Sequence, residues 1–141
     1  MILYVDTSAL VPLVIDESSS VACGELWDAA DRVTTTRLAY VEASAALAMA
    51  ERIGRISVGE AAAGRENLRM LWTVVDVVEI DESLMGLAAN LARIHALRGY
   101  GATHCAAAVA LSDDQVVAAT GDTHLLAAWR AEGLAVRDTN A

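Results

Sequence analysis

Three acidic residues stand at positions where side chains could do chemistry. Asp6 directly follows the apolar run Ile2–Val5, Asp122 closes the Thr120-Gly121-Asp122 segment after the apolar run Gln115–Ala119, and Glu42 lies in an alanine-rich segment. Taken alone, an aspartate after a strand is more often a helix cap or a turn residue. Glu42 is different, because an unpaired carboxylate among apolar neighbours is costly to bury. If the three carboxylates meet, their repulsion calls for a hard cation with oxygen ligands, either Mg²⁺ or Mn²⁺.

Polar side chains next to these acids could support the same chemistry. Thr7, Ser8 and Thr120 could steady carboxylates or bind a substrate phosphate through their hydroxyls, and helix capping or turn formation is an equally good interpretation. His104 is expected to be a hydrogen-bonded structural residue rather than a general base, because cysteine and alanines surround it and a metal would supply the base.

Strands and helices alternate along the chain. Apolar and β-branched runs predict strands, and helix formers with caps predict the helices between them. We expect strands at Ile2–Val5, Val33–Thr36, Val74–Ile80, Gln115–Ala119 and Ala135–Val136, and helices from Thr7 or Ser8 onwards and at Ala39–Arg52, Ser57–Trp72, Asp81–Leu97, Ala102–Leu111 and Thr123–Ala131. This order predicts an α/β fold: one domain over residues 1–141, with a parallel central sheet flanked by helices on both faces.

The predicted topology says where the acids should lie. In open parallel sheets the ligand site lies beyond the carboxyl ends of the strands. Asp6 and Asp122 both follow strands, so they should converge on one edge of the sheet, and Glu42 joins them if its helix leans over that edge.

Composition narrows the class of protein. The 141 residues carry 19 acidic and 10 basic side chains, every base is arginine, and the net charge of −9 argues against broad nonspecific binding of nucleic acid. A nuclease whose carboxylates surround a metal is still compatible with this charge. The chain has no apolar run long enough to span a membrane and no signal-peptide pattern, so we expect a cytoplasmic protein without membrane contact. Cys23 and Cys105 have no CxxC spacing and are expected to be buried thiols.

Four segments together resemble the motifs of the PIN domain family, in order and with ordinary spacing. They read YVDTSALVPL from Tyr4, RLAYVEASAAL from Arg37, RGYGATHCAAA from Arg98 and VAATGDTHLL from Val117. The similarity spans nearly the whole chain and is greatest to the VapC toxins of bacterial toxin-antitoxin pairs. It implies a metal-dependent ribonuclease, an RNA substrate, restraint by a VapB-type antitoxin and a homodimer.

The resemblance also assigns roles to residues. It makes Asp6, Glu42 and Asp122 the catalytic and metal-binding acids, with Asp6 as the anchoring ligand and the other two holding or orienting an ion or the nucleophilic water. The remaining acidic position of the family falls on Gly101, which supplies neither oxygen nor charge. We therefore expect weaker cation binding and impaired activity.

Two other functions share parts of this pattern. A chain with Gly101 could be a catalytically inactive PIN-domain protein that acts only by binding an antitoxin or RNA. A phospho-receiver domain would also be parallel α/β with acids at strand ends, but it needs an acidic pair after the first strand and a lysine near the last, and this chain has no lysine.

Overall fold

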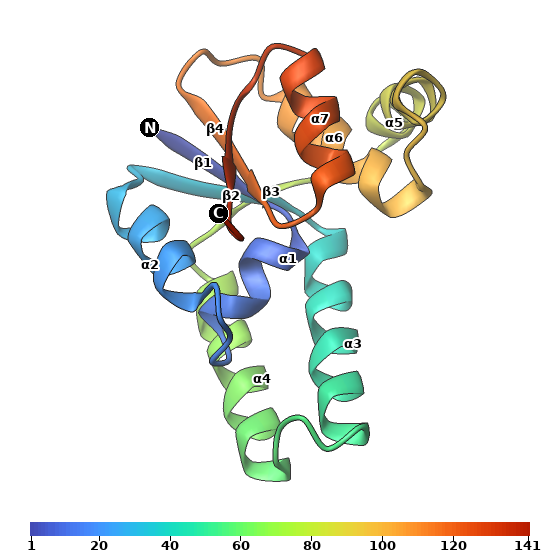
Figure 1. Cartoon of the computed structure of the whole chain (residues 1–141). Coiled ribbons are helices and arrows are strands. Elements are labelled where there is room, and N and C mark those ends of the chain that lie inside the picture. The colour runs from blue at the N-terminus through green and yellow to red at the C-terminus, as the bar shows by residue number, and fades with distance from the viewer.

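A parallel sheet forms the centre of the computed structural model, which describes residues 1–141 (Figure 1). Its strands are β1 (Ile2–Val5), β2 (Arg32–Thr36), β3 (Asp76–Val78), β4 (Val116–Thr120) and β5 (Ala135–Asp138), in the order β3-β2-β1-β4-β5. All four neighbouring pairs are parallel, with Leu3 opposite Val33 on one side and Val117 on the other. The strands β2 and β3 therefore lie on one side of β1, and β4 and β5 lie on its other side.

Helices cover both faces of the sheet, which confirms the predicted fold class (Figure 1). They are α1 (Thr7–Leu10), the 3₁₀ turn η1 (Val11–Leu13), α2 (Ser20–Ala29), α3 (Leu38–Arg52), α4 (Val58–Trp72), α5 (Glu82–His95), α6 (Gly99–Ala110) and α7 (Thr123–Ala131). One face packs against α5, α6 and α7, and the other against α1, η1 and α3. None of the helices has the length and apolar character needed to cross a membrane.

The alternating side chains of β1 divide the core in two. Tyr4 belongs to the cluster around α5, α6 and α7, and it packs edge-on against Trp129 with ring centroids 5.7 Å apart. Leu3 and Val5 point to the opposite face and join the cluster that contains Leu47 of α3. Because β1 is buried on both faces, its sequence is a continuous apolar run.

Local signals account for several helix ends. Ser57 and Glu60 form the predicted capping box at the start of α4, and the Asp81 carboxylate accepts a hydrogen bond from the Leu84 N–H at the start of α5. Gly133 has a φ of +87°, a left-handed conformation that suits the residue after the end of α7.

Three details of the sequence prediction were wrong. The helix α2 was missed, since it buries only Cys23 and therefore lacks an apolar periodicity to recognise. The third strand is shorter than Val74–Ile80, because only Asp76–Val78 pairs with β2. The helix predicted at Ala102–Leu111 begins earlier, because α6 starts at Gly99 with Arg98 as its N-cap.

Candidate active site

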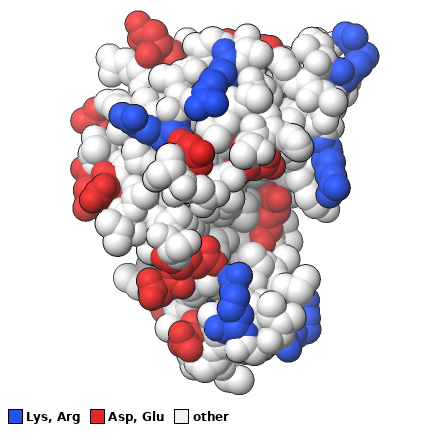
Figure 2. Space-filling model, viewed as in Figure 1, with Lys and Arg blue, Asp and Glu red and all other residues white.

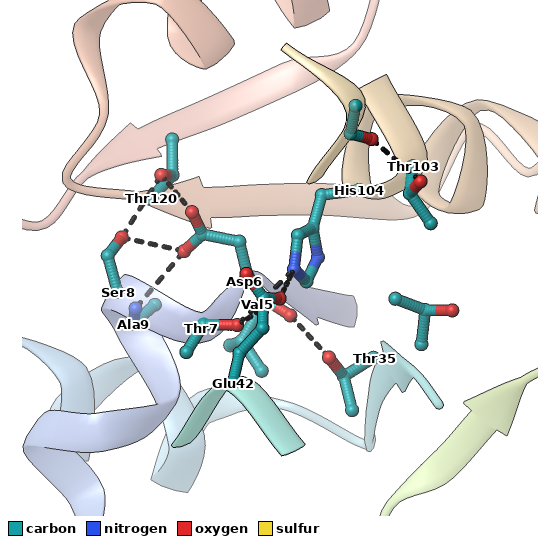
Figure 3. Close-up of polar contacts among 12 residues, drawn as sticks. Val5, Asp6, Thr7, Ser8, Ala9, Thr35, Glu42, Thr103, His104 and Thr120 are labelled. Carbon is teal, nitrogen blue, oxygen red and sulfur yellow. Dashed lines mark hydrogen bonds and ion pairs between the residues drawn. The ribbon is translucent and has the colours of Figure 1, made fainter. Parts of the chain in front are cut away.

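Asp6 lies at the carboxyl end of the central strand β1, where the chain enters α1. Its side chain caps that helix and is only 6 % exposed. Oδ1 accepts hydrogen bonds from the Ser8 hydroxyl at 2.7 Å and the Ala9 N–H at 3.1 Å, and Oδ2 accepts one from the Thr120 hydroxyl at 2.6 Å (Figure 3). Burial raises the pKa of the Asp6 carboxyl although these donors favour its charged form. The carboxylate is thus held rigidly and at an energetic cost.

Glu42 projects from α3 toward the same end of the sheet. Its Oε1 accepts a hydrogen bond from the Thr7 hydroxyl and lies 2.7 Å from Nε2 of His104 on α6 (Figure 3). Burial works to raise the pKa of the Glu42 carboxyl, but the contacts with His104 and Thr7 outweigh it and hold the pKa below its usual value. Glu42 therefore stays charged among apolar neighbours.

Asp122 lies two residues beyond the end of β4 and begins α7. Its Oδ1 accepts hydrogen bonds from the His124 and Leu125 N–H groups, and its own N–H donates to the Thr120 hydroxyl oxygen at 3.0 Å. Thr120 links Asp122 to Asp6, since the same hydroxyl donates to Asp6. Asp122 is exposed, unlike Asp6.

Gly101 is the third residue of α6, and its surroundings are open. A Cβ placed on Gly101 would meet no other atom within 4 Å, and its φ lies outside the left-handed region. No side chain caps the start of α6, and its first turn holds no acidic residue. The backbone therefore has no need of a glycine here, and the space for a larger side chain is present.

These residues share one cavity of about 530 Å³. Asp6, Thr7, Ser8, Glu42, Ala96, Leu97, Arg98, Tyr100, Gly101, His104, Asp122, His124 and Leu125 line it. The cavity lies beyond the ends of β1 and β4, the neighbouring strands between which the chain changes direction across the sheet. The structure thus brings the three acids predicted from sequence, and Gly101, to one cavity.

Carboxylate oxygens suit a hard divalent cation, but the acidic side chains of this cavity are not grouped closely around one point. Asp122 and Glu42 each keep one carboxylate oxygen that accepts no hydrogen bond from the protein. Nowhere in the chain, however, are three His, Cys, Asp or Glu side chains grouped closely enough to hold a metal ion. Gly101 also lines the cavity and has room for a side chain.

The three hydroxyls proposed as substrate contacts are engaged with the acids. Ser8 and Thr120 donate to Asp6 and also lie 3.1 Å from each other, while Thr7 donates to Glu42. In this structure they steady carboxylates, which is one of the two functional roles the sequence suggested.

Sequence reasoning missed the partners of His104. The expectation of a structural, hydrogen-bonded residue gave no hint that its ring bridges Glu42 and Tyr4. The spacing of Gly101 and His104 was an available signal, because residues three apart share a helix face and both line the cavity. Arg98, Tyr100 and His124 were also not assigned to the cavity.

Basic and acidic side chains are mixed on the face of the molecule that Figure 2 shows. In Figure 2 the arginines on the visible side stand apart and alternate with acidic groups. Several of them are already paired, such as Arg37 with Glu79, Arg69 with Glu66 and Arg55 with Glu17. Carboxylates of the chain itself thus engage Arg37, Arg69 and Arg55.

Comparison with known proteins gives a consistent result. The PIN domain model matches residues 3–129. The chain is 37% identical to Ribonuclease VapC45 of Mycobacterium tuberculosis over 135 residues, which cover 96% of this chain and 94% of the relative.

Solved structures share the fold. PAE2754 from Pyrobaculum aerophilum has a TM-score of 0.72 at 23% identity and covers 98% of this chain and 89% of its own. VapBC-5 from Mycobacterium tuberculosis, described as a member of the VapBC family of toxin-antitoxin systems, has a TM-score of 0.60 at 19% identity, with 97% and 98% covered. Together with the acids at the ends of β1 and β4, these matches establish that the chain belongs to the PIN domain family and, within it, to the VapC-type ribonucleases.

Proposed function

We propose that this protein is a toxin of the VapC type whose cavity hydrolyses RNA phosphodiesters with the help of Mg²⁺ or Mn²⁺, and that Gly101 impairs this activity. The observation that carries the proposal is the common cavity: Asp6, Glu42 and Asp122 line it, and Gly101 leaves an open space in its wall. The similarity to Ribonuclease VapC45 supports RNA as the substrate class.

Each acid has a distinct part in the proposed reaction. Asp6 is the anchoring ligand, because Ser8, Ala9 and Thr120 fix both of its oxygens. Asp122 and Glu42 each present one free oxygen with which to hold or orient an ion or a water molecule. When bound, the cation would neutralise charge on the scissile phosphate and lower the pKa of water.

The chain's own residues also shape the substrate path. Arg98 lines the cavity and is free of any ion pair, so its guanidinium can contact an RNA phosphate. Tyr100 stands beside it with 67 % of its surface exposed. Both lie next to the position that Gly101 leaves without a carboxylate.

A VapB-type antitoxin and a second copy of the chain are the proposed partners. The likeness to VapBC-5, which belongs to a family of toxin-antitoxin systems, supports the antitoxin. A groove of about 700 Å³ offers a surface for either partner, with apolar walls from Leu38, Tyr40, Val41 and Trp72 and with arginines at its edge. We further propose a cytoplasmic location.

The second candidate is a PIN domain that binds partners without cleaving RNA. The lack of any three-residue metal cluster in the chain favours it. Both candidates predict antitoxin binding, so only catalysis separates them.

The test is a cleavage assay on a panel of structured and single-stranded RNAs. We expect slow cleavage that requires Mg²⁺ or Mn²⁺, stops with a chelator and disappears in Asp6→Asn. Asn preserves the helix cap, so the loss would report the missing charge rather than misfolding. Cleavage that survives both Asp6→Asn and chelation would contradict the proposed site.

A further inference from the structure

Four side chains from four different elements form one hydrogen-bonded chain beneath the cavity. The Tyr4 hydroxyl lies 2.8 Å from Nδ1 of His104, Nε2 of His104 lies 2.7 Å from Oε1 of Glu42, and the Thr7 hydroxyl donates to the same Oε1. Figure 3 shows His104 directed at Glu42 and Thr7. Tyr4 is fully buried and His104 is 3 % exposed, so the contact between these two side chains is shielded from water, while Glu42 and Thr7 are partly exposed to the cavity.

The hydrogen-bond partners of Nε2 of His104 indicate that this nitrogen carries a proton. The Glu42 carboxylate only accepts hydrogen bonds, and an unprotonated nitrogen 2.7 Å from it would place two acceptors in contact. The Thr7 oxygen, 3.3 Å from Nε2, has already used its proton on Glu42 and can accept a share of this one. Nε2–H therefore donates to Glu42.

The contact with Tyr4 indicates the role of the other ring nitrogen of His104, Nδ1. A buried phenol O–H needs an acceptor, and Nδ1 of His104 lies 2.8 Å from the Tyr4 hydroxyl. The two contacts together make Nδ1 of His104 the acceptor and place the ring proton on Nε2.

The result for Glu42 is an asymmetric carboxylate. Oε1 receives both hydrogen bonds, from Thr7 and from His104, while Oε2 receives none. Since Glu42 lines the cavity, Oε2 is the oxygen left for a ligand there.

We propose that Tyr4 and His104 are positioning residues that act on Glu42: Tyr4 fixes the tautomer of His104, and His104 holds Oε1 of Glu42 so that Oε2 is presented to the cation. This inference rests on the proposed function, because it assigns a purpose to a carboxylate that the proposed reaction uses. Groups that orient metal ligands typically change metal affinity about 10- to 100-fold when they are removed.

The test measures Mn²⁺ affinity of the full chain through the relaxation rate of water protons, which needs no catalysis. His104→Leu should weaken Mn²⁺ binding by roughly 10- to 100-fold, as expected for loss of a ligand-orienting group. His104→Gln should restore much of it, because the glutamine amide can donate to Glu42 and accept from Tyr4. Tyr4→Phe should weaken binding less than His104→Leu, because His104 remains but loses the group that fixes its tautomer.

A matched control uses the same chemical change elsewhere. His95 contacts Glu132 outside the cavity, at 2.8 Å, so His95→Leu should leave Mn²⁺ affinity unchanged. Nitrogen-15 NMR of the imidazole in the unmodified chain provides a readout that a variant's failure to fold cannot disturb. We expect the His104 resonances of a protonated Nε2 and an unprotonated Nδ1.

The outcomes separate this inference from the proposed function. Mn²⁺ affinity that falls in Glu42→Gln but stays unchanged in His104→Leu would overturn the positioning role and leave the metal site in place. Unchanged affinity in both variants would remove Glu42 from the site and overturn both proposals. A protonated Nδ1 in the NMR spectrum would overturn the tautomer assignment and with it the role of Tyr4.

Discussion

Gly101→Asp adds a carboxylate to the first turn of α6, on the wall of the cavity that already holds three acids. The change needs no rearrangement, since a Cβ at this position meets no other atom within 4 Å. Considered within the helix alone, the substitution should stabilise the fold. The higher helix propensity of aspartate over glycine and the attraction of an acid to the helix N-terminus together add about 0.5–1.3 kcal/mol to the free energy of unfolding.

Repulsion from the neighbouring acids opposes that gain. Two carboxylates ~8 Å apart at an effective dielectric constant of ~40 repel each other by roughly 1 kcal/mol. Without a divalent cation we therefore expect the free energy of unfolding to stay nearly unchanged. Mg²⁺ at about ten times its dissociation constant would add about 1.4 kcal/mol to the free energy of unfolding. For a domain of this size, that gain raises the Tm by roughly 4–5 °C.

The assay is a pair of thermal melts, with and without Mg²⁺, followed by RNA cleavage. Gly99→Asp is the matched control: Gly99 begins the same helix and has equally open surroundings, but it does not line the cavity. We expect a larger Mg²⁺-dependent rise in Tm, and faster Mg²⁺-dependent cleavage, in Gly101→Asp than in Gly99→Asp or in the unmodified chain. Adding Asp6→Asn to that variant should abolish cleavage.

Two results would refute this reasoning. Equal Mg²⁺ shifts in Gly99→Asp and Gly101→Asp would mean that the added charge, and not its place in the cavity, attracts the ion. Cleavage by the unmodified chain at the rate of Gly101→Asp would mean that position 101 is not the missing carboxylate. If neither protein cleaves any RNA while both bind an antitoxin, the inactive PIN domain is the better interpretation.

Three further outcomes are expected. Asp6→Asn should raise the Tm of the metal-free chain near neutral pH, because burial disfavours the Asp6 charge and Asn keeps the cap of α1. The advantage of Asp6→Asn over the unmodified chain should grow as pH rises above the ordinary Asp pKa of 3.8, because a raised pKa in the folded state favours folding only while the carboxyl is protonated. Urea titrations in which this difference in the free energy of unfolding does not change with pH would contradict the prediction. Ser57→Ala should lower the free energy of unfolding by about 1 kcal/mol through loss of the capping box, with no effect on Mg²⁺-dependent stability. Light scattering at micromolar concentration should find a homodimer, and a monomer there would count against the proposed assembly.

The sequence alone determined the features that depend on short-range signals. The apolar run of β1 followed by Asp6, the capping box at Ser57 and the alternation of strands and helices were enough to predict a parallel sheet with acids at the ends of β1 and β4. These features could be predicted because helix propensity, helix capping and the burial of a strand on both faces depend on residues close together in the sequence. The order of the four motifs likewise predicted the family and the gap at Gly101.

Only the tertiary structure decided how the site is held together. His104 and Glu42 are 62 positions apart, and His104 and Tyr4 are 100 apart, so their contacts depend on the order of the strands and on where α3 and α6 cross the sheet. Local patterns carry no information about such distances. The first turn of α6 at Gly99 is a similar case, because glycine has poor helix propensity and the turn forms as part of a helix packed closely against α5 and α7. The number of free oxygens on each acid follows from those contacts, and so the chemistry of the cavity could not be derived from the sequence by itself.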